Sequence, residues 1–392
     1  MHGRTESEAP IRVEIVEGFP SSLDTIASRS PSGRCFLRAA WYEAAAAGNP
    51  KTAIATRKDG SPVAAIPTAE FGPPLFGARA VPGSYWPFRS ILIVADAQLA
   101  ELATLLSSSQ VCRALSPVWR VGPVLRDDPA TGLLEHAAAA AGWTVLVRTL
   151  GQSFVMDLAD LIASGDWPRK STRRRLANYE RKLAREGEIE LRFATGGDWT
   201  DEDFEALATI EANSWVGKSS DGSGAKFLTA EQRALWRRAI RDPHIAEALS
   251  ATILRVAGQP AAFSFDLRTG NRQYSIAGSY DERFAAARAG KIVTYHQLEW
   301  AASQGVENVD LGAGDSGYKR EMGAVPGSEI VDLLIVRSRS MGQLLSLKWG
   351  GESALGRAVF RSSGHARKRR RRIARHLAAA GAVAGTVIAV AE

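Results

Sequence analysis

The sequence has few cysteines and histidines, and their spacing excludes several classes of site. Among 392 residues there are two cysteines, Cys35 and Cys112, and they form no CxxC pair. The six histidines show no HExxH or similar spacing. Neither a disulfide framework nor a zinc site is indicated, and no metal cofactor is expected. Two isolated thiols in a long chain fit a reducing cytoplasm.

Long hydrophobic runs are also scarce. Residues 1–6 contain no apolar segment of the kind that a signal peptide has. Residues 377–391 form an apolar run, but a spanning helix needs roughly 20 such residues. We therefore expect a cytoplasmic protein. The C-terminal run has two interpretations, a loosely packed tail or a peripheral contact with the inner membrane face through the basic segment before it.

Positive charge is concentrated in two segments. The net charge is +7, yet residues 169–185 hold eight Lys/Arg against one acid, Glu180, and residues 365–376 hold seven and no acid. These segments together carry +14, so the rest of the chain carries about −7. The distribution indicates local surfaces for anions, such as phosphates, tRNA or anionic lipid, with a solvated helix face as the alternative.

The order of the predicted elements indicates an α/β (α+β) fold with two similar halves. A chain of this length exceeds one ordinary core, so two domains are expected. In the first half, a hairpin is expected at 52–57 and 62–68, and separate strands at 143–149 and 153–158. The second half is expected to contain strands at 188–195, 251–256, 261–268, 273–280, 306–311 and 329–336, with helices at 201–215, 229–241 and 291–304.

The first candidate site is an Ala/Gly-rich turn that opens a helix, Arg288-Ala289-Gly290-Lys291. Backbone N–H groups in the first helical turn have no partner within the helix, and the helix dipole adds positive charge there. Such a turn suits a pyrophosphate. Gly290 lets a phosphate approach the backbone, and Arg288 and Lys291 supply counter-charge. The alternative is an ordinary strand–helix turn.

The second candidate site follows a predicted strand and combines three glycines with four reactive side chains, Asp310, Asp315, Tyr318 and Lys319. A carboxylate here can accept a proton from an attacking amine, and Tyr318 can protonate a leaving thiolate. Lys319 can orient an acidic group of the donor or acceptor. The alternative is an Asx-rich turn that connects two strands.

Together these segments resemble the GNAT superfamily, and within it the CelD/BcsL-type branch linked with bacterial cellulose and exopolysaccharide synthesis. The resemblance covers residues 170–337 well and the first half more loosely. It rests on the basic helix 171–187, Asn213-Ser214-Trp215, Gln259–Phe263, Tyr280–Gly290 and Asp310–Lys319. The usual phosphate-loop pattern, Gln/Arg-x-x-Gly-x-Gly/Ala, is altered, since Arg283, Ala286 and Arg288 occupy its first, fourth and sixth places.

The resemblance implies two GNAT-like domains, as in Fem-type proteins, each a mixed, mainly antiparallel twisted sheet flanked by helices. The implied segments are a degenerate N-terminal GNAT-like domain at 11–165, a basic linking helix at 166–187, a C-terminal acyltransferase domain at 188–340 and a basic and apolar tail at 341–392. Residues 288–291 would hold acyl-CoA, and the Asp310–Lys319 segment would border the acceptor.

The implied activity is transfer from acetyl-CoA or another acyl-CoA to an amine or hydroxyl of a small-molecule or saccharide-related acceptor. GNAT enzymes use direct attack on the thioester, which suits a chain without a convincing nucleophilic pair. Two alternatives remain at this point. One is a Fem-like transferase that uses aminoacyl-tRNA, with the basic helix contacting the RNA. The other is a catalytically degenerate GNAT scaffold.

Overall fold

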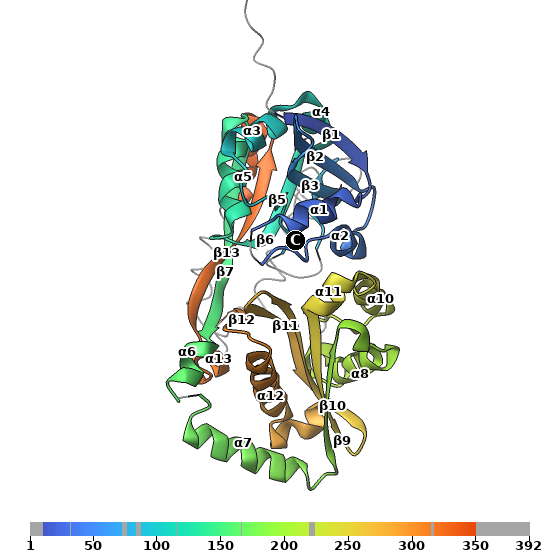
Figure 1. Cartoon of the computed structure of the whole chain (residues 1–392), viewed down its shortest axis with the longest axis vertical. Helices are drawn as coiled ribbons and strands as arrows, with labels where there is room; N and C mark the ends of the chain where they lie inside the picture. Colours follow the sequence, from blue (N-terminus) through green and yellow to red (C-terminus); the bar gives the residue numbers. More distant parts are fainter. Residues whose placement is uncertain are drawn as a thin grey trace, which may run out of the picture. The chain divides into compact units, whose positions relative to one another are not determined.

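The computed structural model describes residues 11–31, 33–72, 77–83, 88–115, 117–165, 167–218, 224–314 and 317–349. These residues form two compact units, shown in Figure 1. Unit 1 contains the described residues of 11–31, 45–151 and 329–349, and unit 2 those of 33–44 and 152–328. The chain enters unit 2 for residues 33–44 and returns to unit 1, and it crosses again within strand β7 (Thr144–Asp157) and within strand β13 (Val325–Val336).

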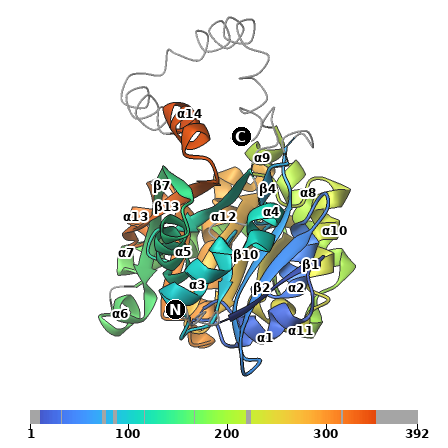
Figure 2. The same cartoon turned by 90° about the horizontal axis from the view of Figure 1, so that it is seen from above.

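Unit 1 is a mixed sheet with helices packed against it. Its strand order is β1-β2-β3-β4-β6-β13-β7, in which β4 and β6 are parallel, while β5 pairs with β3. Helices α3 and α5 pack side by side (Figure 2). The remaining elements are β1 (Ile11–Glu17), α1 (Ser22–Ser28), β2 (Lys51–Arg57), β3 (Pro62–Glu70), β4 (Arg79–Ala80), β5 (Leu92–Ile93), α3 (Leu99–Ser107), α4 (Ser109–Leu115), β6 (Val118–Leu125), α5 (Pro129–Ala140) and α14 (Arg339–Trp349).

The hairpin of β2 and β3 shows how the local sequence sets the fold of unit 1. The turn contains Gly60 at φ +83°, a left-handed conformation that glycine adopts without steric cost. The carboxylate of Asp59 accepts hydrogen bonds from the backbone N–H and the hydroxyl of Ser61. These bonds close the turn, and the strands pair antiparallel as the sequence predicts.

Unit 2 contains a sheet ordered β7-β12-β11-β10-β9-β8, in which β11 and β12 are parallel and the other pairs antiparallel. Helix α12 covers one face, and α8, α10 and α11 cover the other (Figure 1). The elements are α2 (Ala39–Ala45), α6 (Leu158–Ala163), α7 (Lys170–Leu183), β8 (Ile189–Thr195), the 3₁₀ turn η2 (Gly196–Asp198), α8 (Asp201–Ala212), α9 (Trp215–Lys218), α10 (Ala230–Ala239), α11 (Pro243–Ala248), β9 (Leu249–Val256), β10 (Gln259–Thr269), β11 (Arg272–Tyr280), the 3₁₀ turn η3 (Glu282–Ala287), α12 (Ala289–Ser303), β12 (Asn308–Ala313) and α13 (Tyr318–Glu321).

Aromatic side chains fill one face of the sheet in unit 2. Phe265 of β10 makes edge-on contacts with Trp236 and Phe227, at centroid distances of 4.8 and 5.1 Å. Aliphatic side chains on the opposite face, including Leu254 and Val256, pack against α12 through Ile292. Because both faces of the central strands are buried, these strands hold a rigid frame for the loops at their ends.

The expected mixed sheet flanked by helices is confirmed. One detail is wrong, because the two strands expected at 143–149 and 153–158 are a single strand, β7. Gly151 does not interrupt it, since a glycine tolerates the extended backbone as well as turns. None of the helices in the described part of the chain combines the length and apolar character that crossing a bilayer requires. Of the basic and apolar tail predicted at 341–392, residues 341–349 belong to helix α14 (Arg339–Trp349), and residues 350–392 lie outside the described residues.

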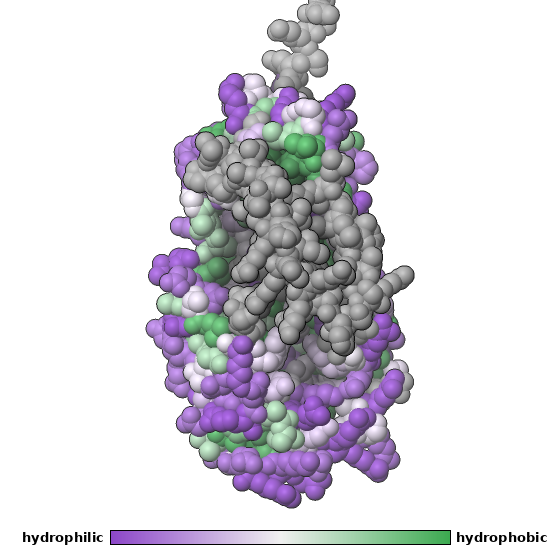
Figure 3. Space-filling view, turned by 180° about the vertical axis from the view of Figure 1, so that it is seen from behind, coloured by the Kyte–Doolittle hydropathy of each residue, from purple (hydrophilic) through white to green (hydrophobic). Residues whose placement is uncertain are grey.

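Hydrophilic side chains dominate the end of unit 2 that carries α7 (Figure 3). The apolar residues Leu176, Tyr179 and Leu183 of this helix contact the hydrophobic core, as their shared face predicts. The intervening arginines, such as Arg174 and Arg181, are exposed. The helix is therefore amphipathic, with one packed face and one charged face.

Candidate functional site

The parallel strands β11 and β12 separate part-way along their length. Their pairing ends with Tyr274 opposite Asp310. Directly afterwards β11 carries one extra residue, Ile276, against β10. Strand β12 likewise carries an extra residue against β7 before Ala313. Because bulges bend a strand and interrupt its ladder, the two strands diverge beyond their last shared pair.

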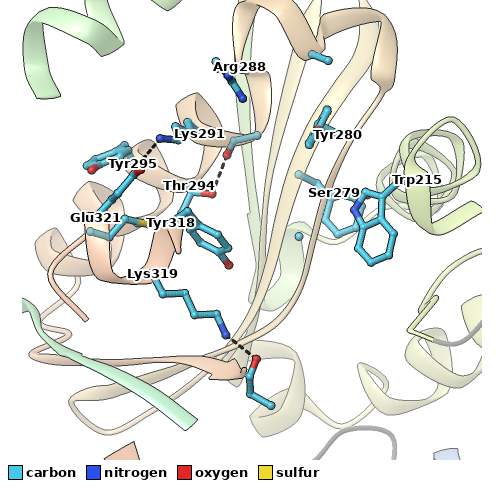
Figure 4. A pocket seen from close by; sticks show the side chains of 16 residues that line it. Trp215, Ser279, Tyr280, Arg288, Lys291, Thr294, Tyr295, Tyr318, Lys319 and Glu321 are labelled. Atoms are coloured by element: carbon cyan, nitrogen blue, oxygen red, sulfur yellow. Dashed lines mark hydrogen bonds and ion pairs between the residues drawn. The ribbon is translucent and has the colours of Figure 1, made fainter. Parts of the chain in front are cut away.

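The divergence opens a cavity of about 520 Å³ within unit 2 (Figure 4). This volume is in the range, roughly 300–1,000 Å³, of small-molecule sites. Its walls come from the ends of β11 and β12, the first turns of α12, and α9 and α13. The lining residues are Trp215, Phe263, Gly278, Ser279, Tyr280, Ala285, Arg288, Gly290, Lys291, Thr294, Tyr295, Ala313, Tyr318, Lys319, Glu321 and Met322.

The N-terminus of α12 is built by an unusual backbone geometry. Arg288, the residue before the helix, adopts the left-handed conformation at φ +57°, which is uncommon for a residue other than glycine. The first hydrogen bond of the helix runs from the Lys291 N–H to the Arg288 carbonyl. The N–H groups of Ala289 and Gly290 therefore precede the helical ladder, where the helix dipole favours an anion. Gly290 lines the cavity, whereas Ala289 is fully buried and does not.

Gly290 is required by the close approach of an aromatic ring. A Cβ atom at this position would lie 2.8 Å from Cδ1 of Tyr280, which is closer than real Cβ contacts. Tyr280 ends β11, so its ring crosses the first turn of α12 and forms part of the cavity wall. The glycine therefore lets the end of the strand and the start of the helix meet at the cavity.

Two cations lie at the rim of the cavity. The ammonium of Lys291 is 2.6 Å from Oε2 of Glu321, and this ion pair lowers the pKa of the Glu321 carboxyl (Figure 4). Arg288 lines the same cavity and is exposed. Within the described residues its guanidinium makes no hydrogen bond, so its donors face solvent at the rim.

Tyr318 and Lys319 are adjacent in sequence, but their side chains differ in exposure and in contacts. Tyr318 is 42% exposed, and its ring points into the cavity (Figure 4). Lys319 is buried, and its Nζ atom donates hydrogen bonds of 2.8 Å to the carbonyls of Gly312 and Ala313. The ammonium thus holds the end of β12 to α13, while the phenol reaches the open space.

Asp310 is buried on β12 and is not among the lining residues. Its Oδ1 accepts a hydrogen bond of 2.8 Å from the Gly312 N–H, and burial raises the pKa of its carboxyl. The structure thus brings the expected donor-site residues 288–291 together with Tyr318 and Lys319, and it places Asp310 behind the wall. Asp315 lies outside the described residues.

The structure also adds wall residues that the sequence did not single out as site residues. Ser279 and Tyr280 end β11, Thr294 and Tyr295 follow on α12, and Trp215 is 61% exposed at α9. A large exposed indole is unusual and offers an apolar contact surface to a ligand. Thr294 and Tyr295 could have been found from the sequence, because they follow Lys291 by three and four residues. This spacing places them on the same face of α12 as Lys291.

Comparison with known proteins identifies the cavity-bearing segment. Residues 170–320 match the family model of the acetyltransferase (GNAT) domain. The match runs from α7 into α13 and so includes both diverging strands and the N-terminus of α12. Residues 170–320 are therefore similar to a GNAT acetyltransferase domain. The search of curated proteins found no match to this chain.

Solved structures with a similar fold include FemX, which is 12% identical, with 85% of this chain and 100% of FemX covered at a TM-score of 0.56. L-PGS from Bacillus licheniformis is 15% identical over 84% of this chain and 95% of that one, at a TM-score of 0.49. A tandem GNAT protein from the clavulanic acid biosynthesis pathway is 13% identical over 83% and 99%, at a TM-score of 0.47. The similarity to FemX shows a shared fold over most of the chain.

No group of histidine, cysteine, aspartate and glutamate side chains in the described residues is arranged to hold a metal ion. The wall of the cavity instead combines backbone groups with three basic side chains, the carboxylate of Glu321, three tyrosines and further aromatic rings. These groups can bind an anionic end and an apolar or extended body of one ligand, and can supply a proton.

Proposed function

We propose that this protein is an acyl-CoA-dependent N- or O-acyltransferase, with acetyl-CoA as the first donor to test. The observation that carries the proposal is the cavity between the diverging ends of β11 and β12, with the N-terminus of α12 and two cations at its rim. A donor with a pyrophosphate at one end and an extended arm at the other matches these features. The GNAT match of residues 170–320 supports the same assignment.

The pyrophosphate would be held by the turn 288–291. Of the predicted residues, Gly290 offers a backbone N–H in the first turn of α12, whereas Ala289 is fully buried and does not line the cavity. The charges of Arg288 and Lys291 add electrostatic attraction. Glu321 fixes the Lys291 ammonium at the rim. The residues that are present therefore fit a CoA pyrophosphate, although the usual phosphate-loop pattern is altered.

The extended arm of the donor would lie along β11. Beyond Tyr274 this strand has no partner in β12, so its backbone edge faces the cavity at Gly278, Ser279 and Tyr280. An unpaired strand edge can hydrogen-bond an extended ligand, and N–H groups fixed in place can polarise a carbonyl. Acyl-CoA, when bound, supplies an acyl group that is activated as a thioester.

Proton transfer would fall to the side chains at the end of β12. Tyr318 is the candidate general acid, because its ring enters the cavity. Lys319 and Asp310 would act as positioning residues, since the first binds the Gly312 and Ala313 carbonyls and the second binds the Gly312 N–H. The role of Asp315 stays a prediction from the sequence.

The acceptor is proposed to be a small molecule or a saccharide-related compound with an amine or hydroxyl. The link to cellulose or exopolysaccharide synthesis, the cytoplasmic location and a contact of residues 365–376 with anionic membrane remain proposals from the sequence. A Fem-like reaction with aminoacyl-tRNA is the second candidate, favoured by the shared fold with FemX and by the exposed arginines of α7.

Calorimetric titration of acetyl-CoA into the full chain tests the proposal. The wild type is expected to bind, and Lys291→Gln to bind about tenfold more weakly, which corresponds to the loss of one charge-assisted hydrogen bond of about 1.5 kcal/mol. Arg241→Gln is the matched control, because Arg241 is exposed in unit 2 and does not line the cavity.

Absence of acetyl-CoA binding by the wild type, or equal binding by Lys291→Gln, would contradict the donor assignment. In that case salt-sensitive binding of tRNA, weakened when arginines of α7 are changed to glutamine, would favour the second candidate. Failure to bind either ligand would favour a degenerate scaffold.

A further inference from the structure

A second cavity, in unit 1, contains charges that the proposed donor site does not use. Its volume is about 190 Å³, and its walls come from the ends of β3, β4 and β6 and from the chain that follows β4. Arg89 and Arg120 line it, together with the aromatic ring of Phe71 and the carboxylate of Glu70. All of these residues belong to unit 1.

Arg120 belongs to a buried group of charges in unit 1. Its Nε atom is 2.9 Å from Oδ1 of Asp332, and its Nη2 atom is 2.7 Å from Oδ2. Arg148 donates to the same Oδ2 at 2.8 Å. Asp332 has no exposed surface, and the two arginines are each at most 9% exposed. Both guanidinium groups therefore donate to one carboxylate, Asp332.

Arg89 adds a third guanidinium to this group. Its Nε atom donates to the Gly83 carbonyl at 3.1 Å, which orients the side chain. Burial and the like charge of Arg120 lower the pKa of Arg89, while Asp332 acts in the opposite direction. Among the described residues, Arg89 and Arg120 thus share the field of one buried carboxylate, Asp332, which leaves one guanidinium charge in excess at the cavity.

The carboxylate of Glu70 does not cancel this excess. The Glu70 side chain is exposed and lies near Arg79. Burial lowers the pKa of the Arg79 guanidinium, and the negative charge of Glu70 opposes this effect. Arg79 is itself buried and donates to neutral oxygens of Thr68 and Asn49. Glu70 therefore balances Arg79, and the excess around Arg89 and Arg120 remains.

Two glycines make the close packing of this group possible. A Cβ atom at Gly83 would lie 2.8 Å from Cγ of Arg89, and one at Gly122 would lie 2.9 Å from Oδ1 of Asp332. The aliphatic stem of Arg89 and the carboxylate of Asp332 can approach the backbone only because these positions lack a side chain. The arginines are therefore held in place before any ligand arrives.

We propose that the unit 1 cavity binds a small oxyanion, the carboxylate or phosphate group of a small-molecule ligand, between Arg89 and Arg120. Guanidinium groups match both anions in geometry and charge, and partial burial strengthens the attraction relative to water. An anion at this place offsets the positive charge of Arg89, which Arg120 repels. Phe71, over which the Arg120 guanidinium lies at 5.5 Å, offers an apolar contact to the rest of the ligand.

Titration of the full chain with inorganic phosphate and, separately, with acetate tests the proposal. At least one of the two is expected to bind to the wild type and about tenfold more weakly to Arg89→Gln. Phosphate binding alone would identify a phosphate ligand, and acetate binding alone a carboxylate. The melting temperature of Arg89→Gln is expected to equal or exceed that of the wild type, because the substitution removes a desolvated, repelled charge.

Two controls separate this cavity from other cationic sites. Arg113→Gln removes an exposed charge of unit 1 and is not expected to change the affinity for the small anion. Binding of phosphate at the donor cavity is recognised by its loss in Lys291→Gln, whereas binding at the unit 1 cavity is expected to remain in that variant. The proposal is overturned if neither anion binds to the wild type, or if Arg89→Gln binds as tightly as the wild type. A melting temperature of Arg89→Gln well below that of the wild type would also overturn it, since Arg89 would then be a structural residue.

Discussion

Asp266 shows how one buried side chain couples the stability of unit 2 to pH. It lies on β10 with no exposed surface and accepts a hydrogen bond of 2.7 Å from the Ser264 hydroxyl. Burial disfavours the ionised form and raises the pKa of its carboxyl to about 7. In the unfolded chain this pKa is about 3.9. At pH values between these two pKa values, the Asp266 carboxyl is protonated in the folded protein and ionised in the unfolded chain.

Stability should therefore fall as the pH rises from about 4 to about 7. The slope from this residue is about −1.4 kcal/mol of unfolding free energy per pH unit, because the native state binds one proton more than the unfolded state. Asp266→Asn should remove this part of the slope, as measured by urea unfolding across the range. The slope should not change in Asp198→Asn, which alters an exposed carboxylate. An unchanged slope in Asp266→Asn would contradict the raised pKa.

At the same scale, the sequence predicts some site residues better than others. The turn 288–291 is local, so its residues can be read from the sequence, and the structure places Arg288, Gly290 and Lys291 at one cavity. The direction of Asp310 cannot be read in this way, because the bulge before Ala313 decides which side of β12 each side chain faces. Because Asp310 does not line the cavity, we propose a positioning role for it in place of the catalytic role predicted from the sequence.

At the scale of elements, helix α7 is tied to α12 through a histidine. Nε2 of His296 is 2.9 Å from Oε1 of Glu180 on α7, and its Nδ1 is 3.4 Å from Oε2 of Glu299. The carboxylates of Glu299 and Glu180 raise the pKa of His296, in that order of influence, although burial opposes them. A raised pKa means that the folded state favours the protonated ring.

The attachment of α7 should therefore weaken as the pH rises. The contribution of His296 is fully present below its unfolded pKa of about 6.5 and is lost as the pH rises through the higher folded value. Hydrogen exchange of the α7 amides, corrected for intrinsic rates, should show greater opening at pH 8.5 than at pH 5.5. His296→Gln should remove most of this difference, whereas His244→Gln, an exposed histidine of α11, should retain it. Equal protection at both pH values in the wild type would contradict the role of His296.

The apolar face of α7 could be predicted from spacing alone, and so could the existence of α8 and α12. The diverging strands could not. The sequence indicates that β11 and β12 exist. Their separation, however, depends on bulge residues, which are Ile276 in β11 and one residue before Ala313 in β12. A residue can be recognised as a bulge only when the register of the partner strand is known. A bulge is a property of a strand pair, and one strand's periodicity does not encode it.

At the scale of the whole molecule, the pairing of strands that are distant in the sequence cannot be predicted from local sequence patterns. Strand β6 pairs with β13 over Val118–Leu125 and Ile330–Val336. This pairing also brings Arg120 to Asp332, and Arg148 reaches the same carboxylate from β7. None of these residues is close to another in sequence, so the charged cavity of unit 1 had no sequence signal. The fold class could be predicted because each element has its own local pattern.

The crystal structure of the full chain soaked with acetyl-CoA tests the central claim most directly, because it locates both ends of the donor in one measurement. The account predicts electron density for the pyrophosphate at the N-terminus of α12, beside Arg288 and Lys291, and for the acetyl thioester between β11 and β12, within reach of Tyr318. Density for the donor in another place, or a cavity without density in crystals soaked at saturating acetyl-CoA, would contradict it.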